Sequence, residues 1–168
     1  SDVYKRQIFY GSATGTTADI ARRIGRLLDV ADKDIHDVGE TAPDKVADYD
    51  TLVIGSSTWG DGGLEDDWYD FVAGMQPLDL GGKKSAIFGC GDETMSDTFC
   101  NAVGILYERL RDTGATFIGE FPATGYHFDK SEASDGATMR GLVLDEVNHP
   151  ELTPTRLRDW TDQLKKEM

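Results

Sequence analysis

Cysteine, histidine and long apolar runs are scarce in this chain of 168 residues, and each scarcity excludes a class of chemistry. Cys90 and Cys100 are too far apart for a CxxC redox or zinc motif, so we expect two small buried hydrophobic residues in a reducing compartment. The three histidines, His36, His127 and His149, lack the spacing of metal ligands and have no nucleophile paired with them by sequence. We therefore expect surface or capping roles for them, with no metal site and no catalytic triad.

Apolar runs of membrane-spanning length are missing as well. The longest runs have only a few residues, as at 86–88, and the first residues include no stretch of signal-peptide length. We therefore expect a soluble, cytoplasmic protein with no membrane partner.

Basic residues are outnumbered: 17 Lys and Arg stand against 31 Asp and Glu, which gives a formal net charge of −14. Such a charge repels nucleic acid and anionic membrane surfaces, and it favours a basic protein partner. A role in nucleic-acid binding is therefore not expected.

The size of the chain is right for a single domain over residues 1–168, since 39% of the residues are hydrophobic and no Pro- or Ser-rich linker divides them. The first residues do not fit this domain well, because Lys5, Arg6 and Gln7 lead into what should be a central buried strand. The hexapeptide at 2–7 resembles a translated sequencing-adapter end. We set residues 1–7 apart as a candidate foreign segment and base the fold on the rest.

Short apolar runs alternate with helical patterns along the remaining chain. Strands are expected at 8–10, 35–38, 52–54, 86–88 and from Thr116 onward. Four helices are expected, the last with Thr153 as N-cap and Pro154 in its first turn. Their inner faces are Ile20, Ile24, Leu27 and Leu28; Trp68, Phe71, Val72 and Met75; Phe99, Val103, Leu106 and Leu110; and Leu157, Trp160 and Leu164. Strands joined by crossover helices predict an α/β fold with a doubly wound, five-stranded parallel sheet flanked by helices.

In such a sheet, ligands bind at the carboxyl ends of the strands, where the strand order reverses. The loop at 11–17 lies at that end and is rich in small hydroxyl residues, so its backbone N–H groups and hydroxyls can bind a phosphate. It has no lysine, which excludes an ATP or GTP loop, and it lacks the GxGxxG spacing of a dinucleotide site. The loop therefore predicts a terminal monophosphate, although a Ser/Thr-rich turn that only caps the helix would look similar.

Two further loops should converge on the same edge. Trp59 is the only large aromatic residue in the small, polar stretch at 56–63, so it offers a stacking surface for a planar heterocycle. A tryptophan in the core or in a partner contact is the other interpretation. In the loop at 89–95, Asp92 could accept a hydrogen bond from the ligand ring, or it could be a solvated turn residue.

These three loops together resemble the flavodoxins, and the resemblance covers nearly the whole chain. The loop at 12–17 is similar to the family's FMN phosphate loop, 57–61 with Asp67 and Trp68 to its first flavin loop, and 88–92 to its second. The segments 125–128, 141–146 and 150–153 resemble the long-chain branch, in which an insertion interrupts the last strand, here at 122–140. The resemblance implies FMN as cofactor, bound by Ser12, Ala13, Thr14, Gly15, Thr16, Thr17, Ser57, Thr58, Trp59, Gly60, Gly91, Asp92 and Met95.

Met95 departs from the family pattern, because it falls where a tyrosine usually stacks on the outer flavin face. A thioether still packs favourably on an aromatic ring, so we expect FMN to bind with changed potentials and faster exchange. Thr16 replaces a common asparagine, which is a mild change. Gly60 is expected to let the Gly60–Asp61 peptide turn its carbonyl toward the flavin.

The resemblance implies an electron-transfer protein rather than an enzyme. It would be a monomeric, low-potential carrier that shuttles single electrons between redox proteins through non-covalently bound FMN. Carboxylates near the flavin would lower its potential and attract a basic NADP-linked flavodoxin reductase and downstream electron acceptors. The candidates are Asp61, Glu65, Asp66, Asp67 and Asp92, although the acidic run at 61–70 is equally consistent with a solvated face.

Two other functions fit parts of the pattern. An FMN-dependent NAD(P)H:quinone reductase uses the same fold, but the charge of −14 argues against it. A cofactor-free receiver or scaffold domain explains the order of the strands, but it leaves Trp59 and the hydroxyl-rich loop unexplained.

Overall fold

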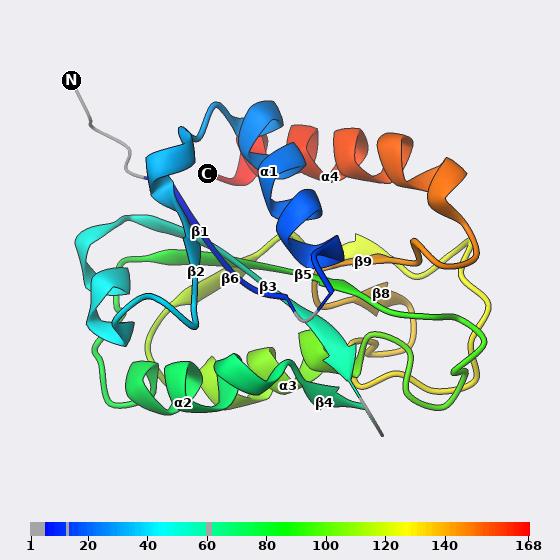
Figure 1. Cartoon of the computed structure of the whole chain (residues 1–168), viewed down its shortest axis with the longest axis horizontal. Coiled ribbons are helices and arrows are strands. Elements are labelled where there is room, and N and C mark those ends of the chain that lie inside the picture. The colour runs from blue at the N-terminus through cyan, green and yellow to red at the C-terminus, as the bar shows by residue number, and fades with distance from the viewer. Residues whose placement is uncertain (1–5, 13, 60–61) are drawn as a thin grey trace.

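A mostly parallel sheet forms the centre of the structure, with the strand order β2-β1-β3-β5-β6 (Figure 1). The computed structural model describes residues 6–12, 14–59 and 62–168, and of Trp59 it describes the backbone only. The strands are β1 (Arg6–Gly11), β2 (Ile35–Asp37), β3 (Thr51–Trp59), β5 (Lys84–Cys90), β6 (Thr116–Ile118) and β9 (Leu142–Leu144). All the pairings among them are parallel, and only the short β4 (Gly63–Leu64) runs antiparallel to β3. The predicted doubly wound fold is confirmed.

Helices cover both faces of the sheet. α1 (Thr16–Leu28) and α4 (Thr153–Glu167) lie on one face, and α2 (Asp66–Met75) and α3 (Asn101–Leu110) lie on the other (Figure 1). Short 3-10 turns occur at Asp32–Asp34, Pro43–Asp48 and Pro150–Leu152. None of the described helices is both long enough and apolar enough to cross a bilayer.

Each central strand is buried on both faces, which explains why the strands read as continuous apolar runs. Successive side chains of a strand point to opposite faces, and so they enter two separate cores. In β1, Ile8 packs with α1 and α4, whereas Phe9 packs with α2 and α3. In β5, Phe88 joins the first core and Ile87 joins the second.

The fifth position of the sheet is shared by two short strands. β6 pairs with the first half of β5, at Lys84 to Ala86, and β9 pairs with its second half, at Phe88 to Cys90. The chain between them, residues 119–141, forms a small hairpin from β7 (Phe121–Pro122) and β8 (Thr138–Met139). This interruption, called the insertion below, contains the predicted span of 122–140.

The insertion packs against α3 and α4 through aromatic and cationic contacts. The Phe128 ring stacks on Phe99 with centroids 5.4 Å apart, and the Tyr126 hydroxyl donates a hydrogen bond to the Val143 carbonyl at 2.8 Å. The guanidinium of Arg156 lies 3.9 Å from the centre of the Tyr126 ring. These contacts fix the insertion beside the start of α3.

The predicted N-cap of α4 was wrong by one residue. Thr153 is not the N-cap of α4, because that position belongs to Leu152 and the Thr153 hydroxyl donates instead to Glu146 Oε2 at 2.9 Å. A preceding 3-10 turn moves the cap by one residue.

Within the segment 1–7, Arg6 and Gln7 form the start of β1, and the Gln7 side chain is fully buried. Among the described residues, Gln7 Oε1 has no hydrogen-bond donor, which is a local cost in the core.

The close approach of the insertion to α3 predicts an unusual effect for Gly104→Ala. Alanine is the better helix former by about 1 kcal/mol. A Cβ at this position, however, would overlap the backbone carbonyl of Glu132, which cannot move as freely as a side chain. We expect a net loss of about 1–3 kcal/mol in the free energy of unfolding, measured by urea denaturation.

Gly25→Ala in α1 is the matched control, because its Cβ would meet the flexible end of Ile35 at 2.7 Å. It should cost clearly less than Gly104→Ala. Equal effects of the two substitutions would show that the insertion does not press on α3 as described.

Candidate functional site

The three loops predicted to bind a ligand begin at matching positions of neighbouring strands. Gly11 of β1 is in register with Ser56 of β3, and Ser56 is in register with Gly89 of β5. The chain leaves β1 toward β2 on one side and later enters β3 on the other, so the strand order reverses between β1 and β3. The loops therefore converge at the edge of the sheet where ligands bind in such folds.

The first loop leaves the N-terminus of α1 open. Gly15 is the N-cap residue, with φ at 92°, and no side chain caps the helix among the described residues. Ser12 Oγ accepts a hydrogen bond from the Gly15 N–H at 3.0 Å, and Thr14 Oγ1 lies 3.5 Å from Thr16 Oγ1. The loop hydroxyls thus bond within the loop, which disfavours the interpretation of a simple helix-capping turn. Ala13 lies outside the described residues.

One predicted ligand-binding hydroxyl is buried without a protein partner. Ser57 Oγ, in β3, has no hydrogen-bond partner among the described residues, whereas Thr17 Oγ1, in the first turn of α1, interacts with the Cys90 thiol and opposes the rise in its pKa. Buried hydroxyls are usually paired, so Ser57 has bonding capacity left for a ligand. The positions of Thr17 after β1 and of Ser57 on β3 fit the predicted phosphate and flavin loops.

The second loop is partly committed to the fold. Thr58 Oγ1 accepts a hydrogen bond from the Ala102 N–H at 3.1 Å, and it thereby fixes the first turn of α3 to β3. The chain then turns from β3 into β4. The Trp59 side chain, Gly60 and Asp61 lie outside the described residues, so the stacking of Trp59 and the orientation of the Gly60 carbonyl stay predictions.

The third loop is a tight turn stabilised by Asp92. Asp92 Oδ1 accepts hydrogen bonds from the Thr94 N–H, the Thr94 hydroxyl and the Asn148 amide, and the Thr94 hydroxyl is the largest cause of the lowered pKa of Asp92. Gly91 sits so close to Cys100 that a Cβ would lie 2.9 Å from the Cys100 nitrogen. Met95 is 52% exposed at the outer side of the turn. The Asp92 side chain therefore has a structural role, in agreement with the turn interpretation.

Glu65 lies closer to the first loop than its position in the sequence suggested. Its buried side chain caps α2 by accepting a hydrogen bond from the Asp67 N–H at 3.1 Å, and a Cβ on Gly11 would overlap it. Burial, and then the charge of Asp67, raise the pKa of Glu65. Trp68, which the resemblance associated with the flavin loop, is fully buried, and its indole donates to the Gly55 carbonyl at 2.7 Å.

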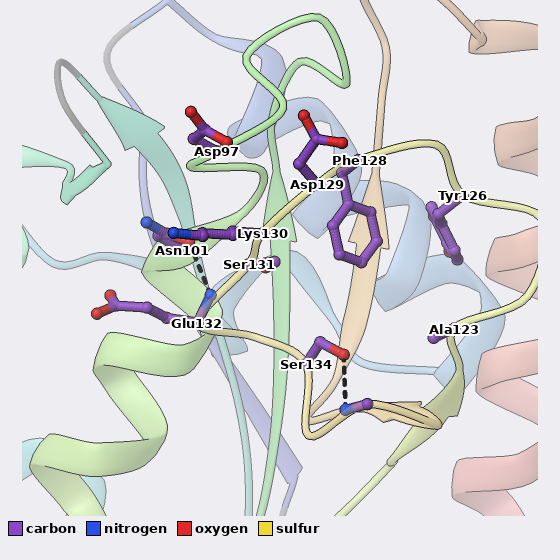
Figure 2. A pocket seen from close by; sticks show the side chains of 11 residues that line it. Asp97, Asn101, Ala123, Tyr126, Phe128, Asp129, Lys130, Ser131, Glu132 and Ser134 are labelled. Atoms are coloured by element: carbon purple, nitrogen blue, oxygen red, sulfur yellow. Dashed lines mark hydrogen bonds between the residues drawn. The ribbon is translucent and has the colours of Figure 1, made fainter.

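A separate hollow of about 760 Å³ lies between the start of α3 and the insertion (Figure 2). Its wall includes Tyr126 and Phe128, and Asn101 holds it together by accepting a hydrogen bond from the Glu132 N–H at 2.8 Å. None of the predicted cofactor residues that the structure describes lines this hollow. It is therefore distinct from the edge of the sheet where the three loops meet.

Both cysteines are free and buried, as predicted, and burial raises the pKa of Cys90 to about 12.

Two of the histidines have different surroundings. His36 packs on Phe9, whereas His149 joins Glu93 and Asp145 in a cluster whose potential metal-ligand atoms lie within 4.8 Å of one another. No short motif indicates this cluster in the sequence, because 52 residues separate Glu93 from Asp145.

Comparison with known proteins decides the family. The family model for flavodoxin matches residues 8–160. The chain belongs to the flavodoxin family. It is an FMN-binding electron-transfer protein rather than an enzyme.

Curated relatives and solved structures agree with this assignment. Flavodoxin 1 of Escherichia coli K12 is 38% identical over 163 residues, which cover 96% of this chain and 93% of the relative. The flavodoxin of Haemophilus influenzae is 39% identical over 164 residues, covering 96% and 94%. The Fusobacterium nucleatum flavodoxin, solved bound to flavin mononucleotide, superposes with a TM-score of 0.88 at 28% identity, covering 97% of this chain and 98% of that one.

The raised pKa of Glu65 leads to a prediction about stability and pH. A carboxyl whose pKa is raised by folding stabilises the fold below its unfolded pKa, and this contribution is lost as the pH rises through the folded pKa. Glu65→Gln mimics the protonated form and keeps an acceptor for the Asp67 N–H. We expect it to raise the free energy of unfolding at pH 7, with the gain over wild type disappearing below about pH 4.

Urea denaturation over this pH range measures the effect. Asp66→Asn is the control, because Asp66 is exposed in the first turn of the same helix, where a negative charge is favourable. It should give no gain at pH 7. A Glu65→Gln variant that is less stable than wild type at pH 7 would contradict the proposed cost of this buried carboxylate.

Proposed function

We propose that this flavodoxin is a low-potential carrier that shuttles single electrons between redox proteins through non-covalently bound FMN, with an NADP-linked reductase as donor. The observation that carries the proposal is the open N-terminus of α1 at the reversal point of the sheet, where Ser57 of β3 also has a buried hydroxyl with no partner among the described residues. FMN supplies reversible one-electron chemistry when bound, and the protein controls its environment.

The first loop would hold the FMN phosphate. The N-terminus of α1 presents backbone N–H groups and the positive end of the helix dipole, and both favour an anion. Among the described residues, Ser12 Oγ accepts from the Gly15 N–H, and no side chain caps the N–H groups of the first helical turn. Gly15 sits at a positive φ with no atom within 4 Å of its ideal Cβ, so the approach to the helix is open. We assign phosphate binding to Ser12, Ala13, Thr14, Gly15, Thr16 and Thr17.

The second and third loops would hold the flavin ring. The Ser57 hydroxyl has no partner in the part of the chain that the structure describes, whereas the side chains of Thr58 and Asp92 are engaged with Ala102 and with Thr94 and Asn148. We therefore assign Thr58 and Asp92 to the site through their backbone and their support of the loops. Trp59 and Met95 are assigned to stacking, and Gly60 and Gly91 to close backbone approach.

The electrostatics of the chain support a low potential. Each unscreened carboxylate about 10 Å from an added negative charge opposes it by about 1.7 kcal/mol at an effective dielectric constant of about 20. Asp92, with its lowered pKa, keeps its charge beside the third loop, and Glu65 lies beside the first. The formal net charge of −14 also favours encounter with a basic partner, which suits a reductase with a basic docking face.

The test is an anaerobic reductive titration of the FMN-loaded protein, followed by absorbance with reference dyes, with and without NADPH. We expect two separate one-electron steps, a low potential for the second step and no direct reduction by NADPH. Reduction by NADPH alone would indicate a quinone reductase instead. Failure to take up FMN would contradict the cofactor site itself.

Gly15→Ala tests the phosphate assignment. Alanine at φ 92° is strained, so the loop should relax without ligand and pay about 1–2 kcal/mol to re-form around the phosphate. We expect FMN binding to weaken by about five- to thirtyfold, measured by fluorescence quenching. The affinity of the variant for riboflavin, which lacks the phosphate, should fall much less.

Gly82→Ala is the matched control. Gly82 also has a positive φ, 82°, with no atom within 4 Å of its ideal Cβ, but it precedes β5 at the opposite edge of the sheet. It should lower stability without changing FMN affinity. Equal losses of FMN affinity in the two variants would contradict the assignment of phosphate binding to the first loop.

Met95→Tyr tests the outer stacking position. Because Met95 is 52% exposed, a tyrosine can be accommodated there without disturbing the core. An aromatic pair contributes about 0.5–1.5 kcal/mol beyond buried area, so FMN should bind more tightly and exchange more slowly. The affinity for riboflavin should rise by the same factor, since riboflavin has the same flavin ring as FMN. No gain for either ligand would show that Met95 is not the stacking residue.

A further inference from the structure

A cluster of three potential metal ligands lies behind the third loop, and no part of the proposed flavin chemistry uses it. Glu93 follows Asp92 and is only 6% exposed, and Asp145 follows β9 and is fully buried. His149 lies just before the 3-10 turn at Pro150–Leu152, and its side chain is 38% exposed. One potential ligand atom from each of the three residues lies within 4.8 Å of the others.

Glu93 has unused bonding capacity that faces this cluster. Its Oε2 accepts one long hydrogen bond, from the His127 N–H at 3.3 Å, and lies 3.6 Å from His149 Nε2. Its Oε1 is buried and has no hydrogen-bond partner among the described residues. A buried carboxylate oxygen without a partner is costly, so the native protein is expected to supply a ligand for it.

The distance between Glu93 and His149 suits a shared cation better than a direct hydrogen bond. At 3.6 Å the contact is too long for a good N–H···O bond. Two ligands bound at about 2.1 Å in a tetrahedral zinc site lie about 3.4 Å from each other. The observed separation is therefore close to one edge of such a tetrahedron.

The neighbouring groups keep these ligands in place. Asp145 Oδ1 accepts the N–H groups of Val147 and Asn148, and Oδ2 accepts the Glu93 N–H and the Asn148 amide. On the other side of the ring, His149 Nδ1 lies 3.7 Å from the exposed Glu151 carboxylate, which favours a cation nearby through its charge and makes no direct hydrogen bond at this distance.

We propose that Glu93 and His149 bind a divalent cation of the zinc class, and that Asp145, whose two oxygens already accept four hydrogen bonds, holds the Glu93 backbone and Asn148 in place and adds negative charge beside the cation. Carboxylate oxygens together with an imidazole nitrogen favour Zn²⁺, whereas Ca²⁺ and Mg²⁺ prefer oxygen ligands alone. The cation lies between Glu93 Oε2 and His149 Nε2, balances the charge of the two buried carboxylates, and gives Glu93 Oε1 a partner through the same carboxylate. Water completes its coordination from the exposed side of His149.

The position of the site couples it to the third loop. Asn148 donates to Asp92 Oδ1 at 2.7 Å and to Asp145 Oδ2 at 2.9 Å, so it bridges the loop and the cluster. Bound Zn²⁺ therefore ties the loop at 91–95 to the segment that precedes α4. None of Glu93, Asp145 and His149 is among the residues assigned to FMN, so the site does not depend on the flavin assignment.

Calorimetric titration of Zn²⁺ into the FMN-loaded protein, stripped with EDTA and kept in excess Mg²⁺, tests the proposal. We expect one Zn²⁺ per chain. His149→Gln and Glu93→Gln should each weaken binding at least about tenfold, because the loss of a ligand exceeds the loss of an outer-shell partner. Asp162→Asn, which removes an exposed charge from α4, should leave Zn²⁺ binding unchanged.

Proton NMR of the imidazoles gives a second measurement that does not depend on the variants. One equivalent of Zn²⁺ should shift the ring resonances of His149 and leave those of His36 unchanged. Wild-type affinity in His149→Gln, equal losses in Asp162→Asn, or displacement of Zn²⁺ by Mg²⁺ would each overturn the proposal. His149→Gln keeps the test decisive even where Glu93→Gln does not fold, because His149 is partly exposed.

Discussion

The common register of β1, β3 and β5 is the constraint on which the rest of the structure depends. Backbone pairing aligns Gly11, Ser56 and Gly89, so the three loops that follow begin side by side. Buried apolar side chains on both faces fix this register, because a slip of one residue would exchange the two cores. The position of the proposed FMN site is thus a consequence of core packing, and the loops would supply its chemistry.

Some polar side chains at this edge of the sheet hold the loops in place, whereas others have hydrogen-bonding groups without a protein partner. The side chains of Thr58 and Asp92 hold α3 and the third loop in place, whereas Ser57 keeps a hydroxyl that no described residue uses. The same division appears behind the third loop, where Asp145 is saturated by hydrogen bonds and Glu93 is not. A site of this kind needs rigid neighbours, and it leaves unpaired the groups that meet the ligand.

The insertion shows how an irregular segment becomes part of the core. It interrupts the fifth strand without breaking the sheet, because β6 and β9 pair with successive halves of β5. Aromatic stacking of Phe128 on Phe99 and the close approach of Glu132 to Gly104 fix it against α3. The hollow of Figure 2 lies between these elements, away from the three loops.

The sequence by itself determined the strand and helix pattern and the doubly wound sheet, because apolar periodicity is a local signal. The interrupted last strand and the family followed from the resemblance of its loops and C-terminal segments to the flavodoxins. The sequence did not determine the cap of α4, where a 3-10 turn intervenes, or the turn role of Asp92, which needs Asn148 from a distant segment. Tertiary structure alone decided the burial of Glu65 beside Gly11 and the meeting of Glu93, Asp145 and His149. Hydrogen-bond partners and pKa shifts depend on which segments pack together, and long-range packing leaves no short motif in a sequence.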